Sequence, residues 1–169
     1  MKENMELEEW RGFCYNERMK ILAFKNYLAF IKNSVGSTAY RNILVNMNGQ
    51  EFDIAMDGQR SCAYFISSTL CSFGLCADIH ATVAGVEKDL LAFGWEEVPA
   101  PVLGSVLIWE KKKQGDMESL HMGFYMGNHT AISNDWVTHV PIEHHYTYDD
   151  TRRTIKILWH PKLSLDWII

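Results

Sequence analysis

Two kinds of hydrophobic pattern divide this chain into a first and a second half. Up to about residue 94, apolar residues recur three or four positions apart, the spacing that predicts one buried face of a helix. From Gly104 onward, short apolar runs and segments of alternating polarity replace that spacing, as is typical of strands. Helices followed by strands predict an α+β fold in which the helices pack on an antiparallel sheet.

Three segments of the first half predict helices. Ser61 and Thr82 are favoured helix N-cap residues, and Gly36, Gly74 and Gly94 stand where helices would stop. The expected helices run from about Asn16 to Lys32, from Cys62 to about Phe73, and from Val83 to about Phe93.

The remaining segments predict strands. Asn48-Gly49 is a strong β-hairpin signal between two β-prone runs. Lys111–Glu118 is polar and is expected to be a loop. The expected strands are Ile43–Met47, Glu51–Met56, Val106–Trp109, Leu120–Met126, His129–Asn134, Val137–Ile142 and Thr154–Trp159.

Composition and charge narrow the class of protein. The 169 residues are 47% hydrophobic and 22% charged and show no repeat or linker, so we expect one domain over residues 1–169. A net charge of −5 argues against a nucleic-acid or anionic-membrane surface. No apolar run approaches the ~20 residues that span a bilayer. The N-terminus, MKENMELEEW, is acidic rather than signal-like, which predicts synthesis in the cytoplasm.

Cys62 is the first candidate for chemistry. It is the first residue of an expected helix, where free backbone N–H groups and the helix dipole favour a thiolate, the nucleophilic form of cysteine. A cysteine can equally be a small buried hydrophobic residue. The other three cysteines, at positions 14, 71 and 76, form no CxxC pair, and a disulfide framework is not expected.

His121 is the candidate partner of Cys62. In the strand Leu120–Met126, Leu120, Met122, Phe124 and Met126 would form an apolar face, whereas His121, Gly123 and Tyr125 would form the other. A glycine beside the histidine leaves room for close approach. A helix-borne cysteine and a downstream histidine satisfy the requirements for covalent Cys–His catalysis, once a third group orients the histidine.

Hairpin geometry predicts that third group. If Gly127-Asn128 is a two-residue loop, strand pairing places Asn134 opposite His121 on the same side of the sheet. An asparagine carbonyl can accept a hydrogen bond from one imidazole nitrogen and leave the other free to take the thiol proton.

The segments SCAYFISSTL, PAPVLGSVLIWE and HMGFYMGN followed by AISN occur in an order that resembles NlpC/P60 and CHAP cysteine peptidases. The resemblance spans about residues 57–134. It implies a papain-like α+β fold, a catalytic pair at Cys62 and His121, and cleavage of amide bonds such as those of peptidoglycan stem peptides in the cell wall. The family's usual Asp before the cysteine is Ser61 here, and counting along the family motif gives Ser133 rather than Asn134 as the third residue.

The sequence thus predicts a cysteine hydrolase (a peptidase or amidase) with Cys62 as nucleophile, His121 as base and Asn134 as orienting residue. It would act on a peptide substrate without a cofactor or metal. An acyltransferase and an inactive peptide-binding module are the alternatives. Adjacent strand residues point to opposite faces, so His144 and His145 do not form a ligand pair. The Cys62 backbone N–H is the simplest oxyanion donor, and Gln59 and Tyr64 could line the cleft.

Overall fold

The computed structural model describes residues 20–114, 117–164 and 167–168. Cys14, the acidic N-terminus and the first residues of the helix expected from Asn16 lie outside the described residues. The described part is an α+β structure with three helices and eight strands. The helices are α2 (Ala23–Asn33), α3 (Cys62–Ser72) and α4 (Val83–Ala92); the strands are β1 (Leu44–Met47), β2 (Gln50–Asp53), β3 (Glu96–Glu97), β4 (Val106–Gln114), β5 (Met117–Gly127), β6 (Thr130–Asn134), β7 (Pro141–His145) and β8 (Thr154–Trp159).

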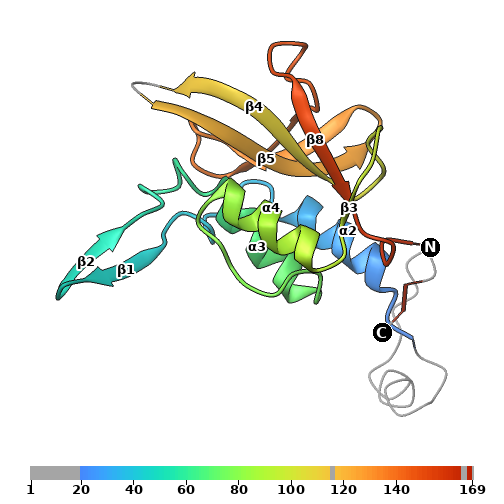
Figure 1. Cartoon of the computed structure of the whole chain (residues 1–169), viewed down its shortest axis with the longest axis horizontal. Coiled ribbons are helices and arrows are strands. Elements are labelled where there is room, and N and C mark those ends of the chain that lie inside the picture. Colours follow the sequence, from blue (N-terminus) through green and yellow to red (C-terminus); the bar gives the residue numbers. More distant parts are fainter. Residues whose placement is uncertain (1–19, 115–116, 165–166, 169) are drawn as a thin grey trace, which may run out of the picture.

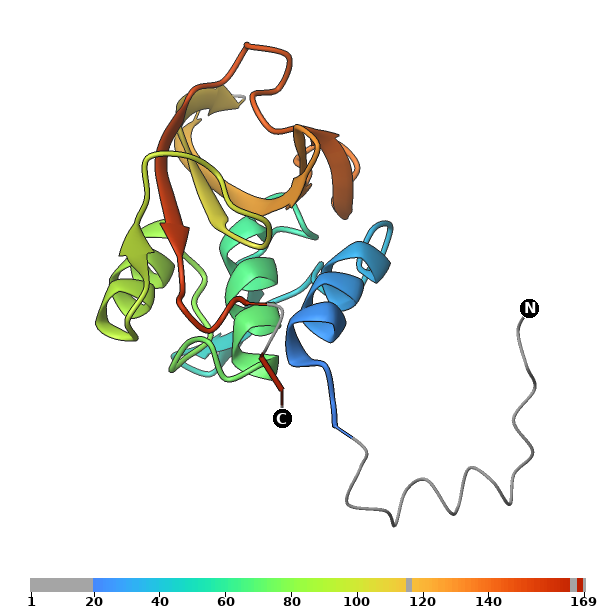
Figure 2. The ribbon, with the colours of Figure 1, turned by 90° about the vertical axis from the view of Figure 1, so that its right-hand side faces the viewer.

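The six strands of the second half form one antiparallel sheet in the order β3-β8-β4-β5-β6-β7. Figure 1 shows the three helices gathered on one side of this sheet, and Figure 2 shows that the sheet curls strongly. The expectation of helices packed on an antiparallel sheet is therefore confirmed. In the described residues, no helix has the length and apolar character needed to cross a membrane.

The side-chain cap predicted from the sequence is present at the start of α4 and absent at the start of α3. Thr82 caps α4 as expected, because its hydroxyl accepts a hydrogen bond from the backbone N–H of Gly85 at 3.1 Å. Ser61 precedes α3 as expected, but its side chain makes no capping bond, and its buried hydroxyl has no partner among the described residues. The first turn of α3 is therefore not stabilised by a side-chain cap.

The β1–β2 hairpin turns at Asn48-Gly49, as the sequence predicts, and pairs Met47 with Gln50. In Figure 1 it projects away from the helices and the large sheet. Asp53, the last residue of β2, begins the connection that leads to α3.

Two expectations for the second half are wrong. Of the polar stretch Lys111–Glu118, which the sequence predicts to be a loop, residues 111–114 continue β4 and residues 117–118 begin β5, with Lys113 paired with Glu118 beyond a β-bulge. Residues 115 and 116 lie outside the described residues. The expected strand Val137–Ile142 is instead a turn followed by β7. The turn forms because the Asp135 carboxylate accepts hydrogen bonds from both backbone N–H groups of Val137 and Thr138 and from the Thr138 hydroxyl.

The hairpin between β5 and β6 differs from its expected geometry at two points. Its two-residue loop is Asn128-His129, one position later than predicted, so that Gly127 pairs with Thr130. A β-bulge then falls at Met126, between the paired positions of β5. The bulge adds one residue to β5 that β6 does not match, and this changes which side chains of the two strands share a face.

Two hydrophobic clusters lie on the two sides of β5. The larger one, between the helices and the sheet, contains Met122 and Phe124. The smaller one, on the other side, contains Leu107, Trp109 and Ala131 with Tyr125 packed against it. The alternation expected along β5 is therefore confirmed, and His121 belongs to the side of the smaller cluster.

Candidate active site

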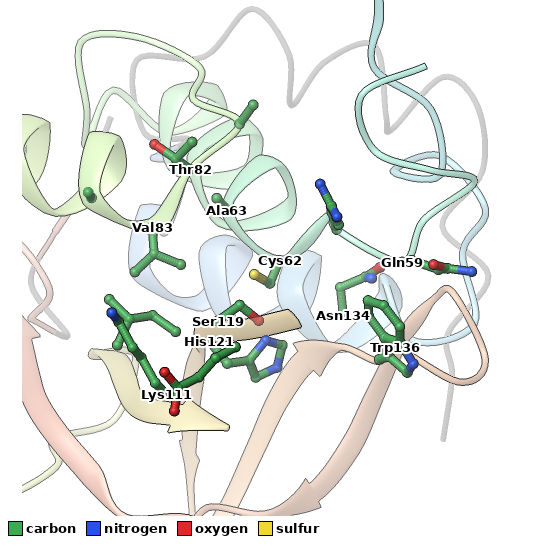
Figure 3. A pocket seen from close by; sticks show the side chains of 15 residues that line it. Gln59, Cys62, Ala63, Thr82, Val83, Lys111, Ser119, His121, Asn134 and Trp136 are labelled. Carbon is green, nitrogen blue, oxygen red and sulfur yellow. The ribbon is translucent and has the colours of Figure 1, made fainter. Parts of the chain in front are cut away.

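Cys62 and His121 line the same pocket, which has a volume of about 360 Å³. The pocket lies between the start of α3, the start of α4 and the first part of β5. In the view of Figure 3, the sulfur of Cys62 lies above the imidazole ring of His121, and the side chain of Ser119 is drawn between them. The structure thus brings together the two residues that the sequence predicted as a pair, 59 positions apart in the chain.

A tight turn holds Cys62 at the pocket. Met56, Asp57 and Gly58 all have positive φ values, of 53°, 52° and 91°, and Gly58 packs against the turn after β6. A Cβ atom at Gly58 would lie only 2.5 Å from the carbonyl oxygen of His139, so only glycine fits there. The chain segment that leads to Cys62 is therefore held in place by its contact with the backbone of the turn after β6.

The Asp53 carboxylate anchors this turn. It accepts hydrogen bonds from the backbone N–H groups of Ile43, Ala55 and Asp57 and from the Asn42 side chain, at 2.8 to 3.0 Å. Burial alone would raise the pKa of Asp53, but these hydrogen bonds outweigh it and lower the pKa to about 2. Asp53 is therefore ionised at neutral pH and ties the β1–β2 hairpin to the segment before Cys62.

The Cys62 thiol is protonated at rest. Burial in the pocket raises the pKa of Cys62, although hydrogen bonds from the backbone N–H groups of Met122 and Ala63 and the charge of Arg152 act in the opposite direction. The expectation that the helix start would favour a resting thiolate is therefore wrong, because desolvation exceeds the effect of the helix amides. Nucleophilic attack from this site needs a base to remove the thiol proton.

His121 is held in place on two sides. Its ring stacks on the indole of Trp109, with ring centroids 5.4 Å apart, and its Nε2 lies 2.9 Å from the hydroxyl oxygen of Ser133. Burial lowers the pKa of His121 well below its usual value, and the nearby positive charge of Arg152 adds to this. His121 is therefore neutral at pH 7, the state in which it can act as a base.

Ser133, and not Asn134, contacts His121. The one-residue bulge at Met126 exchanges the two faces of β6 relative to β5, whereas the shifted loop alone would have left Asn134 on the side of His121. The Asn134 side chain instead donates a hydrogen bond of 2.6 Å to the backbone carbonyl of Gly58. The prediction that Asn134 orients His121 through a two-residue Gly127-Asn128 loop is therefore wrong in its geometry.

Asn134 nevertheless belongs to the site. It is 2% exposed, lines the pocket and joins β6 to the turn before Cys62. Its side-chain oxygen is buried and has no hydrogen-bond partner among the described residues. Asn134 thus connects the strand that supports the histidine to the segment that presents the cysteine.

Three further residues belong to the site although the sequence did not indicate them, namely His144, Tyr148 and Arg152. The Ser133 hydroxyl contacts His144 Nε2 at 2.8 Å and the Tyr148 hydroxyl at 3.0 Å, in addition to His121. Arg152 is 4% exposed and donates hydrogen bonds to the backbone carbonyls of Glu110 and Ser119. The register of β7 against β6 could have revealed His144, because it places that residue on the face of Ser133.

Of the two residues considered for the lining of the cleft, Gln59 and Tyr64, one lies at the pocket. Gln59 lines the pocket, as considered from the sequence. Tyr64 packs against Tyr40 in an edge-to-face arrangement and does not appear among the residues that line the pocket. In the part of the chain that the structure describes, no group of three or more His, Cys, Asp or Glu side chains could hold a metal ion together.

Neither a protein-family model nor a curated protein sequence matches this chain.

Proposed function

We propose that this protein is a cysteine hydrolase of the papain-like NlpC/P60 or CHAP type that cleaves amide bonds. The observation that carries the proposal is the shared pocket of Cys62 and His121, in which His121 Nε2 contacts Ser133. We assign the other ring nitrogen, Nδ1, the role of accepting the thiol proton. A helix-borne thiol, a neutral imidazole and a polar group on the far ring nitrogen are the three parts that covalent catalysis by cysteine requires.

In the first half of the proposed reaction, His121 Nδ1 takes the proton of Cys62 as the sulfur attacks the substrate carbonyl carbon. The backbone N–H of Cys62 at the start of α3 would donate to the resulting oxyanion. The C–N bond then breaks, the His121 proton passes to the departing amine, and the acyl group remains on Cys62 as a thioester. Water, deprotonated by His121, attacks the thioester and releases a carboxylic acid and the free thiol.

The walls of the pocket favour a small peptide as substrate. Ala63, Ala81 and Ala84 are among the residues that line it, and a small aliphatic side chain would fit against them. Lys111 and Glu118 lie at the pocket as well and supply one charge of each sign. Peptidoglycan stem peptides combine small and charged residues, and they are our first choice of substrate.

The test is incubation with purified peptidoglycan peptides and with a generic acyl ester, followed by mass spectrometry. We expect pairs of peptide fragments whose summed mass exceeds that of the substrate by one water, and a transient acyl adduct on Cys62. Cys62→Ala should abolish both, whereas His129→Ala, a change of an exposed histidine outside the pocket, should have no effect. Transfer of the acyl group to an added amine in preference to water would identify an acyltransferase instead. Binding without any adduct would identify an inactive peptide-binding module.

A further inference from the structure

Which atom donates in each hydrogen bond around Ser133 follows from the partner at the end of the chain of bonds, a backbone carbonyl that can only accept. Burial lowers the pKa of His144, so this histidine is neutral at pH 7 and carries one ring proton. Its Nδ1 lies 2.8 Å from the backbone carbonyl oxygen of His145, which can only accept. The proton of His144 is therefore on Nδ1, and its Nε2 is an acceptor.

The Ser133 hydroxyl must then donate its proton to His144. The distance between Ser133 Oγ and His144 Nε2 is 2.8 Å, and Ser133 is fully buried, so bulk solvent does not compete with His144 as the acceptor of this hydrogen. A hydroxyl has one donor hydrogen and two acceptor lone pairs. With the hydrogen used, Ser133 Oγ can only accept from its two other partners, Tyr148 and His121.

Tyr148 fits the role of a donor. Its hydroxyl lies 3.0 Å from Ser133 Oγ, and its ring stacks on His144 with centroids 4.0 Å apart. Burial raises the pKa of Tyr148 to about 12, which keeps its proton in place. One lone pair of Ser133 is thus filled, and the remaining one faces His121 Nε2 at 2.9 Å.

We propose that His144 is a positioning residue that acts through Ser133: it keeps the single proton of His121 on Nε2 and leaves Nδ1 without a proton. A serine hydroxyl alone could donate to His121 or accept from it. His144 removes that choice, because its Nε2 takes the only hydrogen of the Ser133 hydroxyl. The catalytic meaning of this inference rests on the proposed function, whereas the proton position in His121 does not.

The test is NMR of the ring nitrogens in protein labelled with ¹⁵N-histidine, at pH 7, which distinguishes a protonated ring nitrogen from an unprotonated one. We expect the His121 proton on Nε2 in the unmodified protein. In His144→Phe, Ser133 has no acceptor at position 144 and can donate to His121 Nε2, so the Nδ1-protonated form of His121 should appear.

Matched variants separate this effect from a general disturbance. His144→Gln keeps an acceptor for Ser133 in its side-chain carbonyl, and His121 should retain the proton on Nε2. Tyr148→Phe removes a donor but not the Ser133–His144 bond, and should also retain it. His129→Phe, at an exposed site, is the control for adding a phenyl ring.

A proton on Nδ1 of His121 in the unmodified protein would overturn the inference, even if His144→Phe does not fold. An unchanged His121 proton in folded His144→Phe would overturn it as well. With an active enzyme, we further expect His144→Phe to lower kcat with little change in KM, and His144→Gln to restore most of it. Absence of any hydrolysis in the unmodified protein would reject the proposed function and leave the NMR result as a separate measurement.

Discussion

The indole ring of Trp109 lies 5.4 Å from the imidazole ring of His121 and is inclined to it by only 25°. The two residues are directly paired across β4 and β5, and the indole nitrogen of Trp109 donates a 2.7 Å hydrogen bond to the backbone carbonyl of Tyr146. Trp109 is fully buried and thus supplies a rigid surface against which the His121 ring can take one plane. The orientation of His121 therefore depends on ring contact as well as on hydrogen bonding.

Trp109→Phe and Trp109→Leu should separate these contributions. Phenylalanine keeps a flat ring beside His121 but leaves the Tyr146 carbonyl without its donor, which costs about 1–3 kcal/mol in the free energy of unfolding. Leucine removes the flat surface as well, and we expect a further ~10-fold loss of kcat/KM because small misplacement of a reacting group is costly. Chemical denaturation and steady-state kinetics measure the two effects. Equal kcat/KM values in both variants would contradict a role for ring stacking.

Ser133→Ala and Asn134→Ala should reverse the order of importance that the sequence predicts. Ser133→Ala removes the contact with His121 Nε2, and a wrongly protonated base lowers kcat by up to ~10⁴-fold in a comparable triad. Asn134→Ala removes the hydrogen bond to Gly58, so we expect a loss of about 1–3 kcal/mol in stability and a smaller loss of kcat/KM.

Both variants need a comparison of kcat/KM with melting temperature. A folded Ser133→Ala enzyme with normal activity, beside an inactive Asn134→Ala enzyme, would mean that Asn134 orients the histidine after all.

Gly123→Ala should disturb the site from within β5. A Cβ atom there would lie 2.7 Å from the Ile132 carbonyl oxygen, 2.7 Å from the Ser133 Cβ and 2.9 Å from the Trp109 ring. Because backbone must shift to make room, we expect destabilisation of about 1–3 kcal/mol. The shift moves Ser133 away from His121, so kcat/KM should fall more than stability explains. Gly36→Ala is the comparison: it adds a methyl group where a Cβ meets no atom within 4 Å but φ is +78°, so it introduces backbone strain outside the pocket and should leave kcat/KM unchanged in the folded protein.

The acid side of the pH–rate profile should reveal the environment of His121. Burial first and Arg152 second lower the pKa of His121, so the base stays unprotonated below its usual value of 6.5. We therefore expect kcat/KM to decline with acid only well below pH 6.5. In Arg152→Met the pKa of His121 rises, and the decline should begin at higher pH. A profile that does not move in a folded Arg152→Met enzyme would contradict this electrostatic role, and Arg152→Lys is the charge-preserving control.

Asp53→Asn should weaken the turn before Cys62. The charged carboxylate accepts four hydrogen bonds, and removing its charge should cost about 1–3 kcal/mol at pH 7. Because the folded pKa of Asp53 is about 2, below its ordinary value of 3.8, its contribution is complete above the unfolded value and is lost as pH falls toward 2. The difference in unfolding free energy between the two proteins should therefore shrink with acid. A difference that stays constant between pH 7 and pH 3 would contradict this assignment.

The sequence was informative where local chemistry decides the structure. The Asn48-Gly49 hairpin, the Thr82 cap, the start of α3 at Cys62 and strand β8 all follow from residue types within a few positions of each other. Cys62 and His121, which the sequence predicts as a pair, line the same pocket. Such features need no knowledge of distant contacts.

The predictions that were wrong or incomplete concern features that depend on contacts between distant parts of the chain. One bulged residue, Met126, decides whether Ser133 or Asn134 meets His121, and no local pattern marks it. The protonation of Cys62 depends on how deeply the folded pocket buries it, which the helix position alone does not determine. His144, Tyr148 and Arg152 approach the site only because β7 and the loop before β8 return to the same region.

The contact between Gly58 and the turn after β6 has a practical consequence for modifying this protein. Gly58 packs against His139, and its carbonyl accepts a hydrogen bond from the Asn134 side chain. The segment before Cys62 is therefore in contact with the end of β6 and with the turn that follows it. Val137 and Thr138 form an exposed turn. A tag or fluorophore inserted there is nevertheless expected to disturb the position of Cys62 through this contact. The tip of the β1–β2 hairpin at Asn48-Gly49 projects into solvent and offers a site for insertion that leaves the pocket in place (Figure 1).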